Sequence, residues 1–348
     1  MVIEFRRETF QTRFLDPSAN FSEATRSFEV RTDPLTQKTS YIFGVRGATV
    51  NKLDLSSIIQ RSLDRGCPFC PQAIDTTAPK FIPELFPQGR IEVGEAYLFP
   101  NIMPYIQHSA LCVLSSQHFI ALPDFTQEML TNALIASQTY LKRVHEYDAR
   151  ARYLRIGWNY MPPSGSSQPH PHLQVEASYL PTPYEREIME ASQQYYITNG
   201  TNFWSDLITK EQQLGERYIG DTGSICWLVP FAPKGKLLDI LAIFKHRDFF
   251  LDTSEQEFRD FSAGLVRVFH YMSDQNIYSF NLSIISAITR NDHFWMQARI
   301  VPRMTATELD VSDCHYYDVL HDQNSSVGSP EDNCQELKKY FEDNAISH

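Results

Sequence analysis

The same order of elements occurs twice along this chain, and this repetition constrains the fold more than any other feature. Each half contains a β-rich run, a helix with apolar residues at helical spacing, a second β-like run and a final strand. In the first half these segments are residues 110–122, 129–144, 153–160 and the strand that carries QPHPHLQVE. In the second half they are residues 238–251, a helix that begins at Ser254, residues 278–285 and the strand that carries NDHFWMQAR. The matching order predicts a duplicated unit of strands and helices.

A polar, helix-rich middle joins the two halves. Residues 184–196 and 203–219 are rich in Gln and Glu and have helical patterns. We therefore expect a first half over residues 1–182 and a second half over residues 183–348.

Two local patterns refine the second half. Ser254 is followed three residues later by Glu257, which predicts a capping box at the start of the helix. After Arg303 the periodicity is lost, until a short polar helix is expected near residues 334–341.

The composition describes a globular chain with an acidic balance. The 348 residues carry 31 Lys and Arg against 42 Asp and Glu, a formal net charge of −11. This leaves no basic face for a run of phosphates, so we expect no nucleic-acid partner, although a small nucleotide needs only a few cationic groups. The N-terminus does not resemble a secretory signal, and no apolar run reaches membrane-spanning length. We therefore expect a cytoplasmic protein without a membrane partner.

The strongest chemical signal is the segment GSSQPHPHLQ. Side chains alternate along an extended strand, so His170, His172 and Gln174 should point to one face, while the adjacent prolines prevent ordinary ladder pairing. Residues 165–167, Gly-Ser-Ser, offer backbone N–H groups and hydroxyls typical of an anion cradle. A structural role for the histidines is the alternative, but the convergence of these groups favours a site.

A second signal is the pair of cysteines in CPFCP. Six scattered cysteines do not form a disulfide framework, but Cys67 and Cys70 supply half of a tetrahedral metal site. His118 and His170 are the natural completing pair. Less favoured competitors are Cys112 and His108. A redox-active or inert Cys-x-x-Cys remains the alternative.

If His170 is a ligand, His172 is free to act. Its imidazole can attack a phosphorus atom and form a phosphoramidate that a second oxygen nucleophile breaks, which predicts ping-pong kinetics. The attacking nitrogen must be unprotonated, so the other ring nitrogen should donate to a backbone carbonyl or a similar acceptor. In the second half, the positions of His170, His172 and Gln174 are taken by His293, Trp295 and Gln297. We therefore expect the first half to be the chemically active one.

Three motifs, CPFCP, SSQHFIALPDF and GSSQPHPHLQ, resemble those of the galactose-1-phosphate uridylyltransferase family of the histidine-triad superfamily. The similarity extends from about Asp33 to about Gln323. The resemblance implies an α+β fold of duplicated histidine-triad-like halves, each an antiparallel sheet with packed helices, and a homodimer.

The resemblance also implies roles for individual residues. His172 would be the covalent nucleophile, and His170 and His118 would join the two cysteines in one structural zinc site. The residues implied to contact the transferred phosphoryl group are Gln174, Ser167 and Asn159. Those implied to contact the nucleotide are Arg46, Phe99 and Asn101, and those implied at the hexose end are Tyr317, Asp318 and Gln323.

The sequence departs from the family pattern at two places. Some members hold a second metal through a glutamate and three histidines. Glu187 fits the glutamate, but Gln297 and Arg299 replace a late His-x-His, so we predict that this second site is absent. In the tail, Ser312 stands where the family has a lysine.

These observations favour a nucleotidyltransferase. We expect it to move a nucleoside monophosphate, UMP in the first instance, between a nucleotide sugar and a sugar 1-phosphate through a nucleotidyl-histidine. A phosphorylase that uses inorganic phosphate as acceptor is the near alternative, and a nucleotide hydrolase uses water instead. A zinc-stabilised nucleotide-binding module without turnover is the alternative from another class.

Overall fold

One antiparallel sheet runs through both halves of the chain. The computed structural model describes residues 3–44, 53–306 and 311–342. The sheet has ten strands, and all neighbouring strands are antiparallel. In spatial order they are β4 (Ile91–Val93), β5 (Ala96–Pro100), β6 (His108–Val113), β8 (His172–Ser178), β7 (Tyr153–Tyr160), β12 (Phe280–Ile285), β13 (Gln297–Pro302), β11 (Ile240–Phe244), β10 (Ile225–Leu228) and β9 (Tyr218–Thr222).

The order of the strands shows the duplication. Outwards from β7 the first half contributes β8, β6, β5 and β4, and outwards from β12 the second half contributes β13, β11, β10 and β9. This confirms the predicted α+β fold with duplicated antiparallel halves. The prediction gave each half a sheet of its own, whereas the two sheets join where β7 pairs with β12, with Ile156 opposite Ile284. The boundary between residues 182 and 183 stays a prediction.

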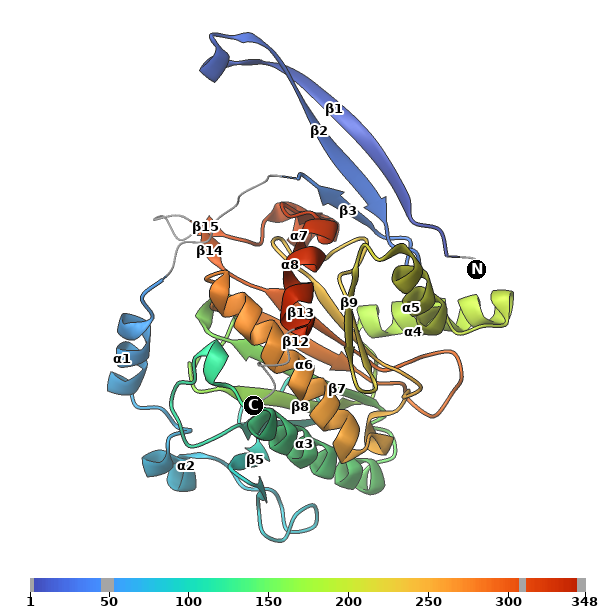
Figure 1. Ribbon diagram of the computed structural model, residues 1–348. Helices are drawn as coiled ribbons and strands as arrows, with labels where there is room; N and C mark the ends of the chain where they lie inside the picture. The colour runs from blue at the N-terminus through green and yellow to red at the C-terminus, as the bar shows by residue number, and fades with distance from the viewer. Residues whose placement is uncertain (1–2, 45–52, 307–310, 343–348) are drawn as a thin grey trace.

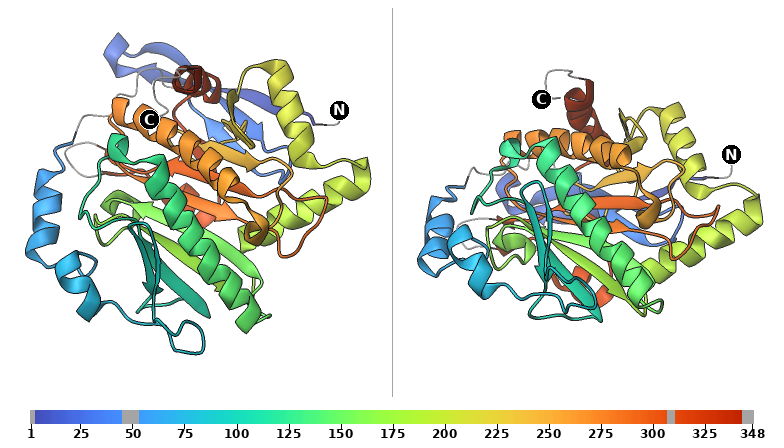
Figure 2. Two further views of the ribbon diagram at one scale, coloured as in Figure 1. Left: turned by 60° about the horizontal axis from the view of Figure 1, so that its bottom comes forward. Right: turned by 90° about the horizontal axis from the view of Figure 1, so that it is seen from below.

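Two long helices lie side by side on one face of the sheet, as Figures 1 and 2 show. They are α3 (Gln127–Tyr147) and α6 (Glu255–Asp274). Thr126 caps α3, and α6 begins with the predicted capping box of Ser254 and Glu257. The inward residues of both helices and of both halves of the sheet form one continuous hydrophobic core.

The opposite face of the sheet differs between the two halves. Over the second half, α4 (Pro183–Asn199) and α5 (Phe203–Leu214) bury the strand residues in a second hydrophobic core. Over the first half, the apolar cluster on this face is small: it consists of Phe99, Leu111 and Val113, packed mainly against the segment around the two cysteines. Helices α4 and α5 therefore cover this face over the second half of the sheet and do not cover it over the first half.

Two predicted elements end earlier than the sequence pattern indicated. The helix expected over residues 203–219 stops at Leu214, because Gly215 adopts a left-handed φ of 68° and ends it. Ile219 belongs instead to strand β9, which pairs with β10. The β-rich run over residues 110–122 is a strand only as far as Val113, because the chain then turns towards α3.

The remaining elements surround the main sheet. A second sheet joins β1 (Arg6–Asp16), β2 (Ser22–Thr32) and β3 (Thr39–Ile42) to β16 (Asn324–Ser326), which is parallel to β3. The β1–β2 hairpin projects from the body of the molecule (Figure 1). The other elements are α1 (Ser56–Asp64), α2 (Pro71–Thr77), β14 (Thr305–Ala306), β15 (Val311–Ser312), α7 (Tyr316–His321), α8 (Pro330–Glu342) and 3-10 turns at Pro17–Ala19, Leu122–Asp124, Pro162–Ser164 and Phe250–Asp252. Helix α8 confirms the helix expected in the tail. None of the described helices is long and apolar enough to cross a membrane.

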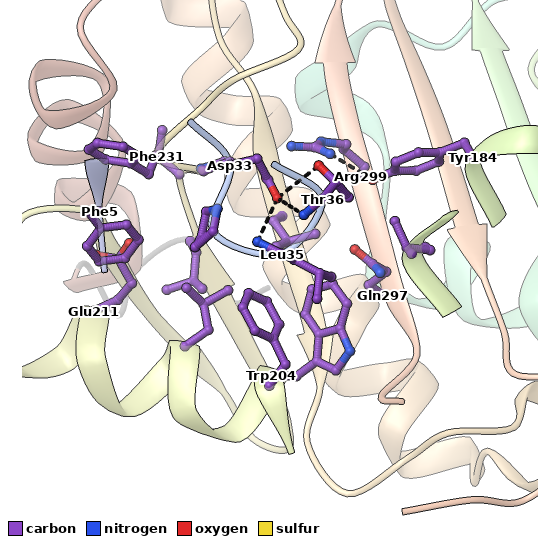
Figure 3. Close-up of a pocket in the computed structure, with 18 residues that line it drawn as sticks. Phe5, Asp33, Leu35, Thr36, Tyr184, Trp204, Glu211, Phe231, Gln297 and Arg299 are labelled. Atoms are coloured by element: carbon purple, nitrogen blue, oxygen red, sulfur yellow. Dashed lines mark hydrogen bonds between the residues drawn. The ribbon is translucent and has the colours of Figure 1, made fainter. Parts of the chain in front are cut away.

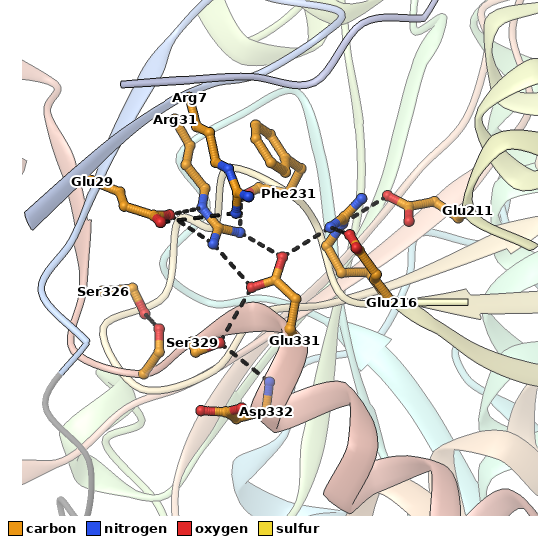
Figure 4. A network of polar contacts seen from close by, with 12 residues as sticks. Arg7, Glu29, Arg31, Glu211, Glu216, Phe231, Ser326, Ser329, Glu331 and Asp332 are labelled. Carbon is orange, nitrogen blue, oxygen red and sulfur yellow. Dashed lines mark hydrogen bonds and ion pairs between the residues drawn. The ribbon is translucent and has the colours of Figure 1, made fainter. Parts of the chain in front are cut away.

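A buried ionic network fastens the tail to the rest of the fold (Figure 4). Glu331 of α8 accepts hydrogen bonds from Arg31 of β2 and from Arg217, each at 2.8 Å, and Arg217 Nε also donates to Glu211 at 3.0 Å. Burial raises the pKa of Glu211 to about 7. Burial alone would also raise the pKa of Glu331, but the bonds and charges of Arg31 and Arg217 lower it to about 2. The network therefore depends on its arginines.

Replacing Arg217 with methionine should destabilise the protein strongly. The side chains of Arg217 and Glu211 are each 2% exposed, so the variant would leave a buried carboxylate without its cation. We expect a loss of about 3–5 kcal/mol in the free energy of unfolding, measured by urea denaturation at pH 7. Arg259→Met is the control, because Arg259 forms an exposed pair with Glu255 worth under about 1 kcal/mol. Equal losses in both variants would contradict the structural role of the network.

Candidate active site and metal centre

His172 begins β8 on the half of the sheet face that α4 and α5 leave uncovered. Its Nδ1–H donates to the backbone carbonyl of His170 at 2.8 Å, so the Nε2 lone pair is free. This is the carbonyl contact that the sequence predicted. Burial lowers the pKa of His172, and the bond to the carbonyl opposes this shift only in part. The imidazole is therefore neutral near pH 7, with a nitrogen available as a nucleophile.

The neighbours of His172 come from three different elements. Gln174 lies on the same face of β8, because the intervening Leu173 enters the core, and Gly157 of β7 lies directly opposite Gln174. The Phe69 ring is 5.1 Å from the His172 ring and 5.8 Å from the Phe99 ring. Sequence reasoning missed Phe69, although it stands inside the CPFCP motif.

Four side chains converge as the sequence predicted for a metal centre. The ligand atoms of Cys67, Cys70, His118 and His170 all lie within 4.8 Å of one another, and this is the one such group in the described parts of the chain. Cys67 Sγ is 3.6 Å from His170 Nδ1, and Cys70 Sγ is 3.3 Å from His118 Nδ1. Sulfur and nitrogen on one tetrahedral zinc lie roughly 3.6 Å apart. The donor set and its spacing therefore fit one metal ion.

A hydrogen bond orients His170 towards the sulfurs, and burial affects the protonation of Cys67. His170 Nε2–H donates to the carbonyl of Ser115 at 2.9 Å, which leaves the Nδ1 lone pair facing the sulfurs. Burial raises the pKa of the Cys67 thiol to about 11, so a cation is needed to stabilise the thiolate.

The two less favoured ligand candidates, Cys112 and His108, have other partners. Cys112 Sγ contacts the carbonyl of Ala133, and His108 Nε2 lies 3.2 Å from Asp148.

A series of side-chain hydrogen bonds links the second half of the chain to Asn159, a residue expected at the phosphate site. Asn281 of β12 donates through Nδ2 to Asn159 Oδ1 at 2.7 Å and to the carbonyl of Ser164 at 2.9 Å. Arg303 Nη1 donates to Asn281 Oδ1 at 3.0 Å, and its guanidinium also pairs with Asp313 at 2.9 Å. These contacts hold the amide of Asn159 in one orientation. Sequence reasoning missed Asn281 and Arg303, because only the pairing of β7 with β12 brings them there.

The residues expected on the nucleotide side lie in different environments. Arg46 lies outside the described residues. Phe99 is 1% exposed and packs in the small apolar cluster, so its ring contacts protein. Asn101 begins an exposed loop, where it accepts from Met103 N and donates to Ser109 Oγ. Ser167 is exposed in the loop before β8.

The residues expected at the hexose end belong to the tail near the small sheet. Tyr317 lies edge-on to Tyr41 at 6.5 Å, and Asp318 accepts from His315 N at the start of α7. Gln323 donates to the carbonyl of Thr39 at 3.0 Å and accepts from its hydroxyl. All three are engaged in packing the tail, and their roles towards a substrate stay predictions.

The residues at the second metal position do not fit a metal ion. Lys38 Nζ lies 3.0 Å from Glu187 Oε2, and Arg299 Nε lies 2.9 Å from Asp239. Figure 3 shows Arg299 beside Tyr184 and Gln297, in a small cavity of about 40 Å³ between the sheet and α5. A site with an ammonium and a guanidinium in it repels a cation. Metal content will test the predicted absence of this site.

Comparisons with known proteins agree on the fold. No family model matches the chain. An ADP-glucose phosphorylase from Arabidopsis thaliana with bound ADP-glucose has a TM-score of 0.69 and 15% identity, covering 89% of this chain and 98% of that one. A GalT-like protein from Arabidopsis thaliana has a TM-score of 0.70 and 16% identity, covering 90% and 99%. A uridylyltransferase has a TM-score of 0.66 and 17% identity, covering 90% and 98%.

The chain therefore shares its fold with this phosphorylase, this GalT-like protein and this uridylyltransferase, which agrees with the resemblance that the motifs indicated. A full-length relative narrows the relationship. An uncharacterized protein from Archaeoglobus fulgidus is 30% identical over 339 residues, which cover 97% of this chain and 99% of that protein. The chain belongs to the same family as this archaeal protein.

Proposed function

We propose that the protein moves a nucleoside monophosphate, UMP being the expected group, between a nucleotide sugar and a sugar 1-phosphate. One observation carries the proposal. The 2.8 Å bond from His172 Nδ1 to the carbonyl of its own segment leaves Nε2 unprotonated, on the same strand face as Gln174. Such a nitrogen is suited to covalent catalysis at phosphorus.

The proposed reaction has two steps. First, the Nε2 lone pair attacks the phosphorus of the donor that bears the nucleoside, and the bond from that phosphorus to the bridging oxygen breaks. The sugar phosphate leaves with the bonding electrons. An acceptor phosphate oxygen then attacks the same phosphorus, and the P–N electron pair returns to Nε2. The Gln174 amide and the Ser167 hydroxyl are proposed to donate to the non-bridging oxygens as charge develops.

We propose that the metal is a structural zinc ion. Cys67, Cys70, His118 and His170 supply four ligands of the types that zinc prefers, and a four-ligand site leaves no open position for substrate. Bound zinc would supply rigidity rather than acid–base chemistry. Since His172 follows His170 by two residues, that rigidity would be transmitted to the nucleophile.

Intact-protein mass spectrometry tests the proposal directly. The protein is incubated with UDP-, ADP-, GDP- or CDP-glucose in the absence of an acceptor. We expect a gain of one nucleoside monophosphate, with the base identified by its mass, and no gain in His172→Gly. The labelled protein is then treated with galactose 1-phosphate, inorganic phosphate or buffer, which separates a transferase from a phosphorylase and a hydrolase. No gain from any donor would favour a binding module without turnover.

Asn281→Ala should slow the formation of this intermediate without unfolding the protein. The variant removes the donor that orients Asn159, and a small misplacement at a reacting centre costs about 10–100-fold in rate. Quenched-flow mass spectrometry measures the rate. Asn199→Ala is the control, because among the described residues the Asn199 side chain bonds only to the carbonyl of Tyr195, at the end of α4. Equal rates in the two variants would show that Asn159 needs no such support.

Three further expectations from the sequence stay predictions. They are a homodimer, a cytoplasmic location and two halves divided near residue 182. Sedimentation at several protein concentrations tests the first.

A further inference from the structure

A cavity of about 300 Å³ lies between α1 and the loop that precedes β8. This volume is within the range of small-ligand sites. Its lining residues are Ile58, Arg61, Ser62, Arg65, Pro162, Ser167, Gln168 and Pro169. Ser167, already proposed to contact the transferred phosphoryl group, therefore also borders this second space. The cavity adjoins the expected phosphate site without containing the nucleophile.

Two arginines give the cavity its charge. Arg61 and Arg65 are exposed and lie four residues apart on one face of the end of α1. Within the described residues, no carboxylate lies within ion-pair distance of either. The neighbouring Asp64 accepts from Gln60 Nε2 at 2.8 Å and does not line the cavity. Both arginines therefore line the cavity, and neither has a carboxylate partner in the part of the chain that the structure describes.

Arg61 and Arg65 place like charges four residues apart. Two other helices instead place opposite charges at this spacing, where Arg259 pairs with Glu255 and Lys338 with Glu342. Two positive charges at this spacing repel and weaken a helix. The two unneutralised charges border one cavity, so they would favour an anion inside it.

The loop adds uncharged donors on the other side of the cavity. Ser62 Oγ donates to Gln168 Oε1 at 3.2 Å, which leaves the Gln168 Nε2 group free to donate. Ser166 Oγ donates to the carbonyl of Gln168 at 2.6 Å and fixes the loop. The Ser167 hydroxyl is exposed beside them. Arginine forks and neutral donors around one space match the oxygens of a phosphate group.

We propose that Arg61 and Arg65 bind the phosphate dianion of the acceptor, so that a phosphate compound and not water is the second substrate. This inference rests on the proposed function. The acceptor oxygen attacks the phosphorus on His172, the P–N bond breaks and its electrons return to Nε2. A dianion has no proton to lose, so no base is required. The same pair would hold the sugar phosphate as it leaves in the first step.

The test compares Arg61→Gln/Arg65→Gln with the wild type in two measurements. In the first, isolated nucleotidyl-enzyme is discharged by glucose 1-phosphate, inorganic phosphate or water. For whichever phosphate discharges the wild type, we expect the half-saturating concentration to rise about 10–100-fold, as loss of charged hydrogen bonds predicts. Discharge by water should stay within twofold. Arg61→Lys/Arg65→Lys should recover part of the loss, because lysine keeps the charge but not the fork.

The second measurement needs no activity. Calorimetric titration of the unlabelled protein with inorganic phosphate and glucose 1-phosphate should show binding that the double glutamine variant loses. Arg259→Gln, which removes one exposed arginine side chain on α6, should bind as the wild type does. Unchanged binding and unchanged discharge in the folded double variant would overturn the inference. Failure of the proposed function has another signature, since no label would then form on His172 in the wild type.

Discussion

Replacing His172 with glycine is expected to abolish the covalent intermediate and to lower turnover by about 10⁴-fold or more. His170 is the nearest alternative nucleophile, but both of its nitrogens are committed. Nε2 bonds to the carbonyl of Ser115, and Nδ1 faces the sulfurs of the two cysteines. Once the imidazole of His172 is removed, the donor phosphorus has no attacking atom in place.

The variant should keep its fold and its metal. The His172 side chain supplies no ligand to the metal centre, so metal content and the thermal unfolding midpoint should stay near those of the wild type. His246→Gly is the matched control, because His246 is an exposed histidine in the second half, at a φ of 61° that glycine adopts readily. It should form the intermediate at the normal rate. A mass gain in His172→Gly would place the nucleophile elsewhere.

The sequence predicted well the features that depend on residues close together in the chain. Alternation along one strand placed His172 and Gln174 on the same face, and the two-residue spacer in CPFCP was enough to predict half of a metal centre. The capping box of α6 is equally local. Each of these inferences spans a few residues, so it does not depend on how distant segments pair.

Long-range pairing is what the sequence could not supply. Asn281 and Asn159 are 122 residues apart, and only the register of β12 on β7 makes them neighbours. The cavity beside Ser167 likewise needs α1 to pack on the loop before β8. The helical spacing of Arg61 and Arg65 was visible in the sequence, but their partner surface was not.

The tail shows the same limit. The role of its residues at the hexose end of a substrate stays a prediction. What the sequence did not indicate is that the parallel pairing of β16 with β3 brings Gln323 to Thr39. A parallel pair between the first and last parts of the chain leaves no local pattern.

The inequality of the two halves has a structural cause. The helices α4 and α5 follow the first half directly and pack on the sheet face of the second. The face they cover is the one that carries His172 in the first half. The sequence comparison of the two halves puts Trp295 and Gln297 where the first half has His172 and Gln174. In the structure, the second half supports Asn159 through Asn281. One duplicated unit thus carries the proposed nucleophile, and the other supports Asn159 beside it.

Replacing Cys67 with serine is expected to remove the metal and much of the stability together. The side chain is 5% exposed, and its sulfur lies 3.6 Å from His170 Nδ1. Serine is a poor ligand for zinc, so the affinity should fall by at least about 100-fold. Metal analysis should give about one zinc per chain in the wild type and almost none in the variant, which also tests the predicted absence of a second site.

The loss of metal should reach the nucleophile through the backbone. Without the metal, the segment from Pro169 to His172 is no longer held to the CPFCP turn. We therefore expect both the unfolding midpoint and the rate of intermediate formation to fall. Removing the metal from the wild type with a chelator should have the same two effects as the variant. Cys314→Ser is the matched control, because Cys314 is exposed and outside the metal centre. If Cys67→Ser kept its zinc, the four-ligand assignment would be wrong. If it lost zinc but kept the full rate, the centre would stabilise the fold without positioning His172.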